Sequence, residues 1–284
     1  MPRVALLAAL VLATLLAGCE SGDRPTNSAS DAPRFVTLAP HLAEILFAVG
    51  AGSQLVGVSA YSDYPAEVTE LPLVGDAFTV DQEQLALLNP DILLAWESGM
   101  PASTIDDLRS AGYRVEVIRT RGLDDIETAM RHIGELAGTA STAVSVADSF
   151  RAELDALAAE HAGKTELSVF FQIAERPLYT VNGDHFISEV LRVCGGRNVF
   201  DDLDTLAPSV DVEAVVARDP DVLVTAGSQT SLDAWRAFDG MAAVRNNRFV
   251  ALPSDETGRA GPRVIDAARA ACKALDAFRA DNAE

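Results

Sequence analysis

The chain has 284 residues, of which 49% are hydrophobic, and a formal net charge of −20. That charge would repel nucleic acid and anionic lipid headgroups, so neither is expected as a partner, and an acidic surface of this kind serves solubility. After the first 33 residues about 250 remain, enough for one large domain or for two lobes with cores of their own.

The N-terminus carries an export signal. Arg3 precedes an apolar run from Val4 to Leu16, which is too short to span a bilayer. The run leads into Leu16-Ala17-Gly18-Cys19, which resembles the bacterial lipobox, whose cysteine receives lipid. An ordinary signal peptide with an incidental cysteine is the alternative.

We therefore predict a signal peptide over residues 1–18, lipidation of Cys19, and a flexible tether over residues 19–33, which are rich in polar residues. Glu20 after the cysteine favours the outer membrane in a cell that has one. The expected location is the periplasm, with the lipid anchor as the link to the membrane.

Short apolar runs alternate with helical patterns along the rest of the chain, which predicts parallel α/β sheets. The expected strands are 34–38, 55–58, 91–96, 113–118, 167–172, 221–225 and 248–252. The expected helices are 42–49, 81–88, 104–110, 188–193, 212–217 and 262–278.

One long helix is expected in the middle of the chain. Residues 139–162 contain neither Pro nor Gly, and apolar residues recur there at three- and four-residue steps, which predicts a helix of about six turns. We interpret it as a rigid backbone helix over residues 139–163, between an N-terminal lobe (34–138) and a C-terminal lobe (164–284) with Rossmann-like cores. A peripheral helix of one continuous domain is the alternative.

An internal repeat supports two lobes. The pattern of residues 80–93 returns without a gap at residues 210–223, 130 positions later. In each copy an Asp is expected to cap a short helix, a Pro to end it and a buried strand to follow. Two such lobes should be related by a pseudo-two-fold axis.

The repeat places Glu83 and Glu213 in the first turns of equivalent helices. The helix dipole favours a carboxylate there whatever the function. The other interpretation is docking to a partner with two-fold symmetry and paired arginines.

Two cysteines remain besides Cys19, and an exported protein meets an oxidising compartment. We expect Cys194 and Cys272 to form a disulfide, with two buried free thiols as the alternative. Neither has a second ligand at a metal-binding spacing.

Ligands of open parallel sheets bind at the carboxyl ends of the strands. The residues past those ends include Tyr61 and Trp96, flat apolar platforms that suit a large planar ligand. Further aromatic residues could extend that surface, although core packing is the commoner role of any one of them, above all of Phe171 and Phe186. The full set is Ser59, Ala60, Tyr61, Trp96, Gln172, Ser254, Asp255 and Arg259, with Phe78, Phe171 and Phe186 as extensions.

Several segments carry a family resemblance, namely Thr37-Leu38-Ala39-Pro40, Tyr61-Ser62-Asp63-Tyr64-Pro65, Leu94-Ala95-Trp96, Val193-Cys194-Gly195-Gly196, and Ser254-Asp255 with Arg259. With these segments the chain resembles the periplasmic cobalamin-binding proteins of bacterial vitamin importers, and the similarity runs over nearly the whole mature chain. The family belongs to the substrate-binding proteins with a helical backbone (class III). The resemblance implies two α/β lobes joined by one long helix, little hinge closure, and a corrin ring in the cleft.

The resemblance also implies roles for residues. It places Cys194 and Cys272 in a disulfide, and Glu83 and Glu213 on the surface that faces a two-fold symmetric ABC permease with its ATPase. The expected ligand-binding residues, from the strand ends and the resemblance together, are Tyr61, Phe78, Trp96, Phe171, Gln172, Ser254, Asp255, Glu256, Thr257, Gly258 and Arg259.

The expected function is capture of cobalamin or another corrinoid by a monomer and its delivery to the importer. Cobalamin is then transported cargo rather than a cofactor. The sequence departs from the family at Ala77 and Ala207, where relatives carry further tryptophans, so part of the aromatic wall is missing.

An enzyme is not expected. Gly57-Val58-Ser59-Ala60-Tyr61 breaks the G-x-S-x-G motif at its last position. Gly50-Ala51-Gly52 follows a helix and lacks the third glycine of a dinucleotide fingerprint, so it is interpreted as a helix end.

A metal-binding relative is disfavoured because the four histidines are scattered. His41 lies at a strand-to-helix turn, His132 and His161 on helices, and His185 in a turn. The remaining alternative is haem or an iron-siderophore complex. Siderophore binders often meet an anionic chelate with basic residues, and here the cleft offers mainly Arg259, which favours a bulky, nearly neutral ligand.

Overall fold

A computed structural model describes residues 32–281. The predicted signal peptide over residues 1–18, Cys19 and the predicted tether up to residue 31 lie outside the described residues. Among residues 32–281, no helix combines the length and the apolar character needed to cross a membrane.

The N-terminal lobe is built on four parallel strands in the order β2-β1-β3-β4. The C-terminal lobe has four parallel strands in the order β10-β9-β5-β8, and a short antiparallel hairpin, β6-β7. The strands are β1 Phe35–Thr37, β2 Leu55–Val58, β3 Ile92–Trp96, β4 Val115–Ile118, β5 Leu167–Gln172, β6 Ala174–Glu175, β7 Leu178–Tyr179, β8 Gly196–Asn198, β9 Val222–Ala226 and β10 Phe249–Leu252. The prediction of parallel α/β lobes is confirmed.

The two sheets have the same topology. Read from the other edge, the second sheet is β8-β5-β9-β10, so that each strand matches the strand of the same rank in the first sheet. In both lobes the first strand in the chain lies second from one edge. The lobes are therefore two copies of one plan, as the repeat predicts.

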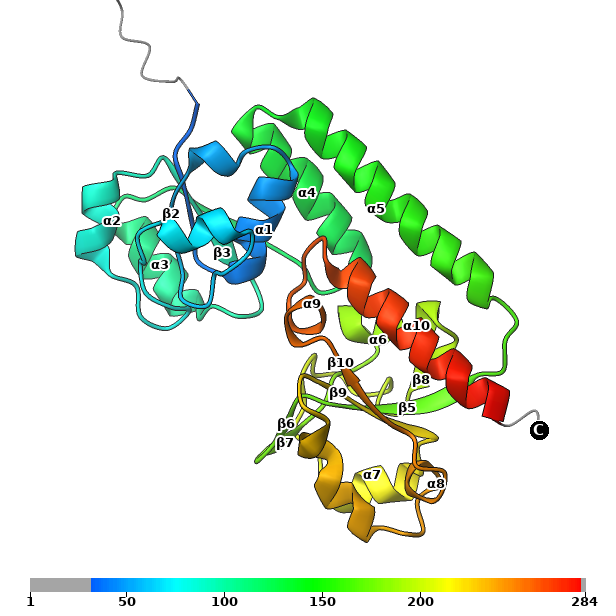
Figure 1. The fold of residues 1–284 in the computed structure, drawn as a ribbon. Coiled ribbons are helices and arrows are strands. Elements are labelled where there is room, and N and C mark those ends of the chain that lie inside the picture. The colour runs from blue at the N-terminus through cyan, green and yellow to red at the C-terminus, as the bar shows by residue number, and fades with distance from the viewer. Residues whose placement is uncertain (1–31, 282–284) are drawn as a thin grey trace, which may run out of the picture. The chain divides into compact units, whose positions relative to one another are not determined.

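Helices cover both sheets and lie between the lobes (Figure 1). The α-helices are α1 Pro40–Ala48, α2 Gln82–Leu88, α3 Ala102–Ser110, α4 Leu123–Ala137, α5 Ala140–His161, α6 Phe186–Val193, α7 Val212–Arg218, α8 Ala242–Arg245, α9 Ser254–Gly258 and α10 Val264–Asp281. Three 3₁₀ segments are η1 Gly52–Gln54, η2 Ala66–Glu70 and η3 Gln229–Ala237.

The long helix α5 leads from the N-terminal lobe to the first strand of the C-terminal lobe. It packs beside α4 along most of its length, and α10 lies near its C-terminal half (Figure 1). Helix α4 was not among the expected elements, although its core-facing side carries Leu123, Ile126, Met130 and Ile133 at helical spacing.

The repeat has a structural basis at the start of equivalent strands. The side chain of Asp91, before β3, accepts a hydrogen bond from the backbone N of Arg34 at 2.7 Å. Asp221, before β9, accepts one from the backbone N of Ser168 at 2.8 Å. Each aspartate thus links the start of one strand, β3 or β9, to the start of the neighbouring strand, β1 or β5.

The expected helix caps are confirmed only in the first copy. Asp81 accepts a hydrogen bond from the backbone N of Gln84 at 2.9 Å and caps α2. Asp211 occupies the same place before α7, but its side chain makes no capping hydrogen bond, so the prediction was wrong there.

The largest hydrophobic core runs through both lobes. It contains Ile92 from the N-terminal sheet, Phe150 from α5 and Val222 from the C-terminal sheet, together with residues of α4, α6 and α10. Separate clusters fill the other face of each sheet. Because one core is shared, a wide separation of the lobes would expose apolar surface, which limits hinge motion.

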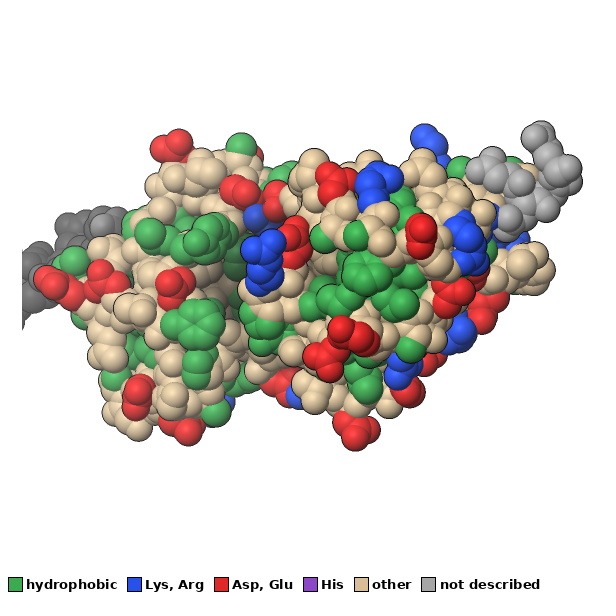
Figure 2. Space-filling view, turned by 90° about the horizontal axis from the view of Figure 1, so that it is seen from below, with side chains coloured by type: hydrophobic (Ala, Val, Ile, Leu, Met, Phe, Trp, Pro, Cys, Tyr) green, Lys and Arg blue, Asp and Glu red, His purple; other side chains and the backbone are tan. Residues whose placement is uncertain are grey.

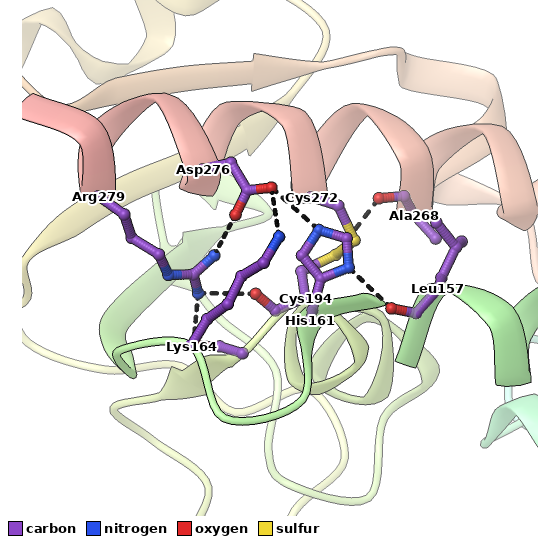
Figure 3. Close-up of a disulfide and its surroundings, with 9 residues drawn as sticks. Leu157, His161, Lys164, Cys194, Ala268, Cys272, Asp276 and Arg279 are labelled. Atoms are coloured by element: carbon purple, nitrogen blue, oxygen red, sulfur yellow. Dashed lines mark hydrogen bonds and ion pairs between the residues drawn. A yellow bond between two sulfur atoms is a disulfide. The ribbon is translucent and has the colours of Figure 1, made fainter. Parts of the chain in front are cut away.

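The structure joins Cys194 and Cys272 by a disulfide, as predicted (Figure 3). Cys194 follows α6, and Cys272 lies on α10. One turn further along α10, Asp276 accepts hydrogen bonds from Lys164 at 2.8 Å and from His161 at 3.1 Å. The end of α5, the end of α6 and α10 are therefore fastened together at one place.

Candidate ligand-binding site

Two aromatic rings stand out from loops of the N-terminal lobe. Tyr61 follows β2 and is 83% exposed, and Phe78 lies in the turn before α2 and is 75% exposed. The two loops are joined by a hydrogen bond from the backbone N of Ala60 to the carbonyl oxygen of Gly75 at 2.7 Å. The structure therefore brings these two predicted residues to neighbouring loops, with their rings in solvent.

Trp96 ends β3, and its indole is half-buried. The ring of His41 meets it edge-on, with centroids 5.0 Å apart. A Cβ atom at Gly99 would lie 1.9 Å from the indole, so only glycine allows the backbone to approach the ring this closely. Contacts on two sides fix the orientation of the indole.

Arg259, just after α9, reaches from the C-terminal lobe to the Tyr61 loop. Its Nη1 donates to Asp63 at 2.6 Å, and its Nη2 donates to the carbonyl oxygen of Tyr61 at 3.0 Å. Nη2 also lies 3.6 Å from the carboxylate of Asp255. The loop after β2 and the segment 254–259 are therefore brought together, as the site prediction requires.

A buried carboxylate lies behind this contact. Glu44, on α1, is only 2% exposed and accepts a hydrogen bond from Arg259 Nη1 at 2.9 Å. It also accepts two from Arg263, at 2.7 and 2.9 Å, while Arg263 pairs with Glu256 at 3.0 Å. The result is an ion network between the lobes.

The network shifts the pKa values of its own members and that of His41 nearby. The hydrogen bond from Arg259 lowers the pKa of the Asp63 carboxyl. Burial opposes the charge of Arg259, but its bonds to Asp63 and Glu44 outweigh this and raise its pKa. Burial, together with the nearby charge of Arg259, lowers the pKa of His41 to about 3. His41 is therefore a neutral ring at physiological pH.

Three of the predicted ligand-binding residues are buried in this structure. Phe171 is 1% exposed and packs in the shared core, and Thr257 is buried on the inner side of α9. Gln172 is buried as well, because its side chain bonds Ser231 and Trp235. Both faces of a parallel sheet are covered, so the side chains of Phe171 and Gln172, at the end of β5, pack inside. The part of these three residues in ligand binding stays a prediction.

The other members of the predicted segment have different surroundings. Ser254 and Gly258 are exposed, and Asp255 and Glu256 are half-buried at the ion network. Phe186, which was considered as an extension of the aromatic surface, is buried in the shared core.

The structure adds apolar residues that the sequence analysis did not single out. Ile173, Tyr179 and Phe238 are large and exposed in the C-terminal lobe, after β5, on β7 and after η3. A cavity of about 300 Å³ between β7, η3 and the start of α7 is lined by Leu178, Trp235 and other residues. Figure 2 shows one side of the molecule, where apolar side chains are exposed in two areas and charged side chains lie between these areas. For Ile173 the sequence offered a signal, an apolar residue directly after a predicted strand.

The docking candidates lie where the repeat put them. Glu83 is in the first turn of α2, Glu213 is in the first turn of α7, and both are exposed. Leu87, one turn after Glu83, is exposed too. Within residues 32–281, no group of three or more His, Cys, Asp or Glu side chains is arranged to hold a metal ion.

Comparisons with known proteins agree with this architecture. The sequence matches the model of a family of periplasmic binding proteins over residues 36–256. The vitamin B12-binding protein of Vibrio cholerae is 34% identical over 246 residues, which cover 86% of this chain and 89% of that protein.

Solved structures give the same result. The crystal structure of a periplasmic vitamin B12 binding protein of Vibrio cholerae is similar with a TM-score of 0.78 and 33% identity, and covers 86% of this chain and 97% of that one. A periplasmic heme binding protein from Pseudomonas aeruginosa has a TM-score of 0.74 and 27% identity, and covers 86% and 92%. The family match spans more than half of the chain and both lobes. The chain belongs to the periplasmic binding protein family.

Proposed function

We propose that this protein captures cobalamin or a related corrinoid between its two lobes and delivers it to an ABC-type importer. Two proteins that it resembles, both from Vibrio cholerae, carry the name of vitamin B12-binding protein. The family is one of binding proteins rather than of enzymes, and the proposed role requires no covalent chemistry.

The charge balance beside Tyr61 carries the choice of ligand. Two guanidinium groups, of Arg259 and Arg263, face four carboxylates. The carboxylates are those of Glu44, Asp63, Asp255 and Glu256. Haem brings two carboxylates of its own, and many ferric siderophores are anionic, so such ligands would meet an excess of negative charge. A bulky ligand without net negative charge fits better.

Binding would rest on burial of apolar surface by a large ligand on a preformed site. Covering an exposed aromatic ring contributes about 1.5–3 kcal/mol. We assign this role to Tyr61, Phe78 and Trp96 in the N-terminal lobe. In the C-terminal lobe we assign the same role to Ile173 and Tyr179, which are exposed there.

The remaining predictions concern the partners and the location. Glu83 and Glu213 are proposed to meet paired arginines of a two-fold symmetric permease, which works with its ATPase. Cys19 is proposed to carry the lipid that anchors a monomer in the periplasm, at the outer membrane where there is one. The proposed organisation is an N-terminal lobe over 34–138, a backbone helix over 139–163 and a C-terminal lobe over 164–284.

Calorimetric titration of the form that lacks residues 1–19 tests the ligand, with cyanocobalamin, haem and a ferric siderophore in parallel. We expect one-to-one binding of cyanocobalamin, with the other two silent. Tyr61→Ala and Trp96→Ala should each weaken binding at least tenfold, while Phe238→Ala, in the lining of the C-terminal cavity, should change it much less. A heat of binding with haem or with the siderophore, but none with cyanocobalamin, would overturn the choice of ligand.

A further inference from the structure

The backbone of Tyr61 adopts a conformation that needs outside support. Its φ of 66° lies in the left-handed region, which bulky residues rarely occupy. The hydrogen bonds within its own loop are long: Ser62 N to Ser59 O measures 3.4 Å, and the two hydroxyls of these serines lie 3.5 Å apart. Both distances are at the limit of a hydrogen bond. The loop is therefore not fixed by these bonds.

Besides the hydrogen bond from Ala60 N to Gly75 O, support for the loop comes from the other lobe. The guanidinium of Arg259 donates hydrogen bonds to the carbonyl oxygen of Tyr61 and to the carboxylate of Asp63. It therefore holds the loop on both sides of Ser62. The Arg259 side chain is only 12% exposed. It is therefore poorly placed to meet a ligand itself, although its segment lies next to the site.

Glu44 in turn holds that guanidinium. Its carboxylate is buried on α1 between Arg259 and Arg263. A buried ion pair is weak support for stability, because desolvation offsets much of the attraction. Its stronger effect here is geometric: two planar guanidiniums are fixed against one carboxylate, and Arg259 keeps a single orientation toward the loop.

We propose that Glu44 is a positioning residue for ligand binding. Through Arg259 it holds the Tyr61 loop in its strained conformation, so that the ring is presented before the ligand arrives. This inference rests on the proposed function, in which Tyr61 packs against the corrin. Because the ring is already in position, less conformational entropy is lost when the ligand binds.

Glu44→Gln keeps the shape of the side chain and removes its charge. In the ligand-free protein, hydrogen exchange of residues 60–64 should become at least fivefold faster. The affinity for cyanocobalamin should fall about tenfold. Asp63 is an exposed carboxylate that pairs with the same guanidinium. Asp63→Asn should also speed the exchange of the loop and lower the affinity, but by less than Glu44→Gln.

Glu127→Gln is the matched control. Glu127 also lies between two arginines, Arg131 and Arg151, but on α4 and away from the loop. This variant should lower stability without changing either the exchange of residues 60–64 or the affinity.

A double-mutant cycle separates positioning from general weakening of the fold. In a Tyr61→Ala background, Glu44→Gln should cause less than a twofold further loss of affinity, because the ring that it positions is gone. Additive losses, or unchanged exchange in Glu44→Gln, would overturn the proposal. If the wild type binds no cyanocobalamin, the proposed function fails, whereas the exchange measurement still decides whether Glu44 holds the loop.

Discussion

Asn89 and Asp219, 130 residues apart in the chain, adopt almost the same left-handed conformation, with φ of 44° and 41°, at the ends of α2 and α7. Each turns the chain from a helix into a buried strand of its own lobe. The two positions differ in one respect: only the side chain of Asp219 accepts a hydrogen bond, from the backbone N of Ala242 at 2.6 Å, where it caps α8.

This difference predicts unequal costs of substitution. Asn89→Ala should lower the free energy of unfolding by about 1 kcal/mol, the cost of a left-handed residue with a Cβ that has no local hydrogen bond. Asp219→Ala should lower it by about 2 kcal/mol, because a helix cap is lost as well. Urea denaturation measures both values. Equal losses at the two positions would show that the cap on α8 contributes nothing.

Loss of the disulfide should cost more. Cys194 and Cys272 close a loop with a sequence separation of 78, and a loop of this length contributes about 4 kcal/mol by restricting the unfolded chain. The variant with both cysteines changed to alanine should be less stable by about this amount. Both cysteines are buried, so a reductant should act on the wild type only under conditions that already unfold it. A loss below about 1 kcal/mol would contradict the prediction.

Acid should destabilise the protein before its carboxylates titrate. Burial lowers the pKa of His41 to about 3 and that of His185 to about 4 in the folded protein, whereas both would be protonated near pH 6.5 when unfolded. The unfolded state therefore binds more protons, and the stability present above pH 6.5 is lost as the pH falls toward these values. Each histidine contributes about 1.4 kcal/mol per pH unit in that window.

His41→Gln should therefore flatten the pH dependence of unfolding, with a loss between pH 7 and pH 4.5 that is smaller than in the wild type by about 2.5 kcal/mol. Urea denaturation across that range measures the slope. A slope parallel to that of the wild type would mean that His41 is not held neutral in the folded protein.

Charge reversal tests the docking surface. Glu83→Arg combined with Glu213→Arg should leave the affinity for cobalamin unchanged but abolish uptake through the importer, since like charges would then face each other. Glu135→Arg with Glu160→Arg is the matched control, because these glutamates are also exposed and lie on α4 and α5. Normal transport of cobalamin by the Glu83→Arg and Glu213→Arg variant, in vesicles that contain the importer, would contradict the docking proposal.

Local pattern was enough to predict most of the sheet and the long helix. The strands carry short apolar runs, and α5 lacks Pro and Gly over its whole length, so both signals lie within a few residues. The shared topology of the lobes followed from a repeat without gaps. Helix α4 was missed although its spacing was readable, and η3 was missed because a 3₁₀ segment lacks the period of an α-helix.

The site was less predictable because its contacts are not local. Glu44 and Arg259 are 215 residues apart, and neither position carries a sequence signal of the other. The rule of strand ends selected residues at the carboxyl ends of the strands, but it did not separate exposed Tyr61 from buried Phe171. That distinction depends on a left-handed backbone at one residue and on the packing of a strand covered on both faces.

The chain passes from the N-terminal lobe to the C-terminal lobe through helix α5, so the stiffness of this helix limits how the lobes can move. A helix of 22 residues is a rod about 33 Å long whose length is set by its hydrogen bonds. It can bend or twist slightly, but it cannot lengthen without breaking those bonds. A partner that pulls on the lobes would therefore load a stiff elastic element, and the protein should spring back to its resting geometry once the load is removed.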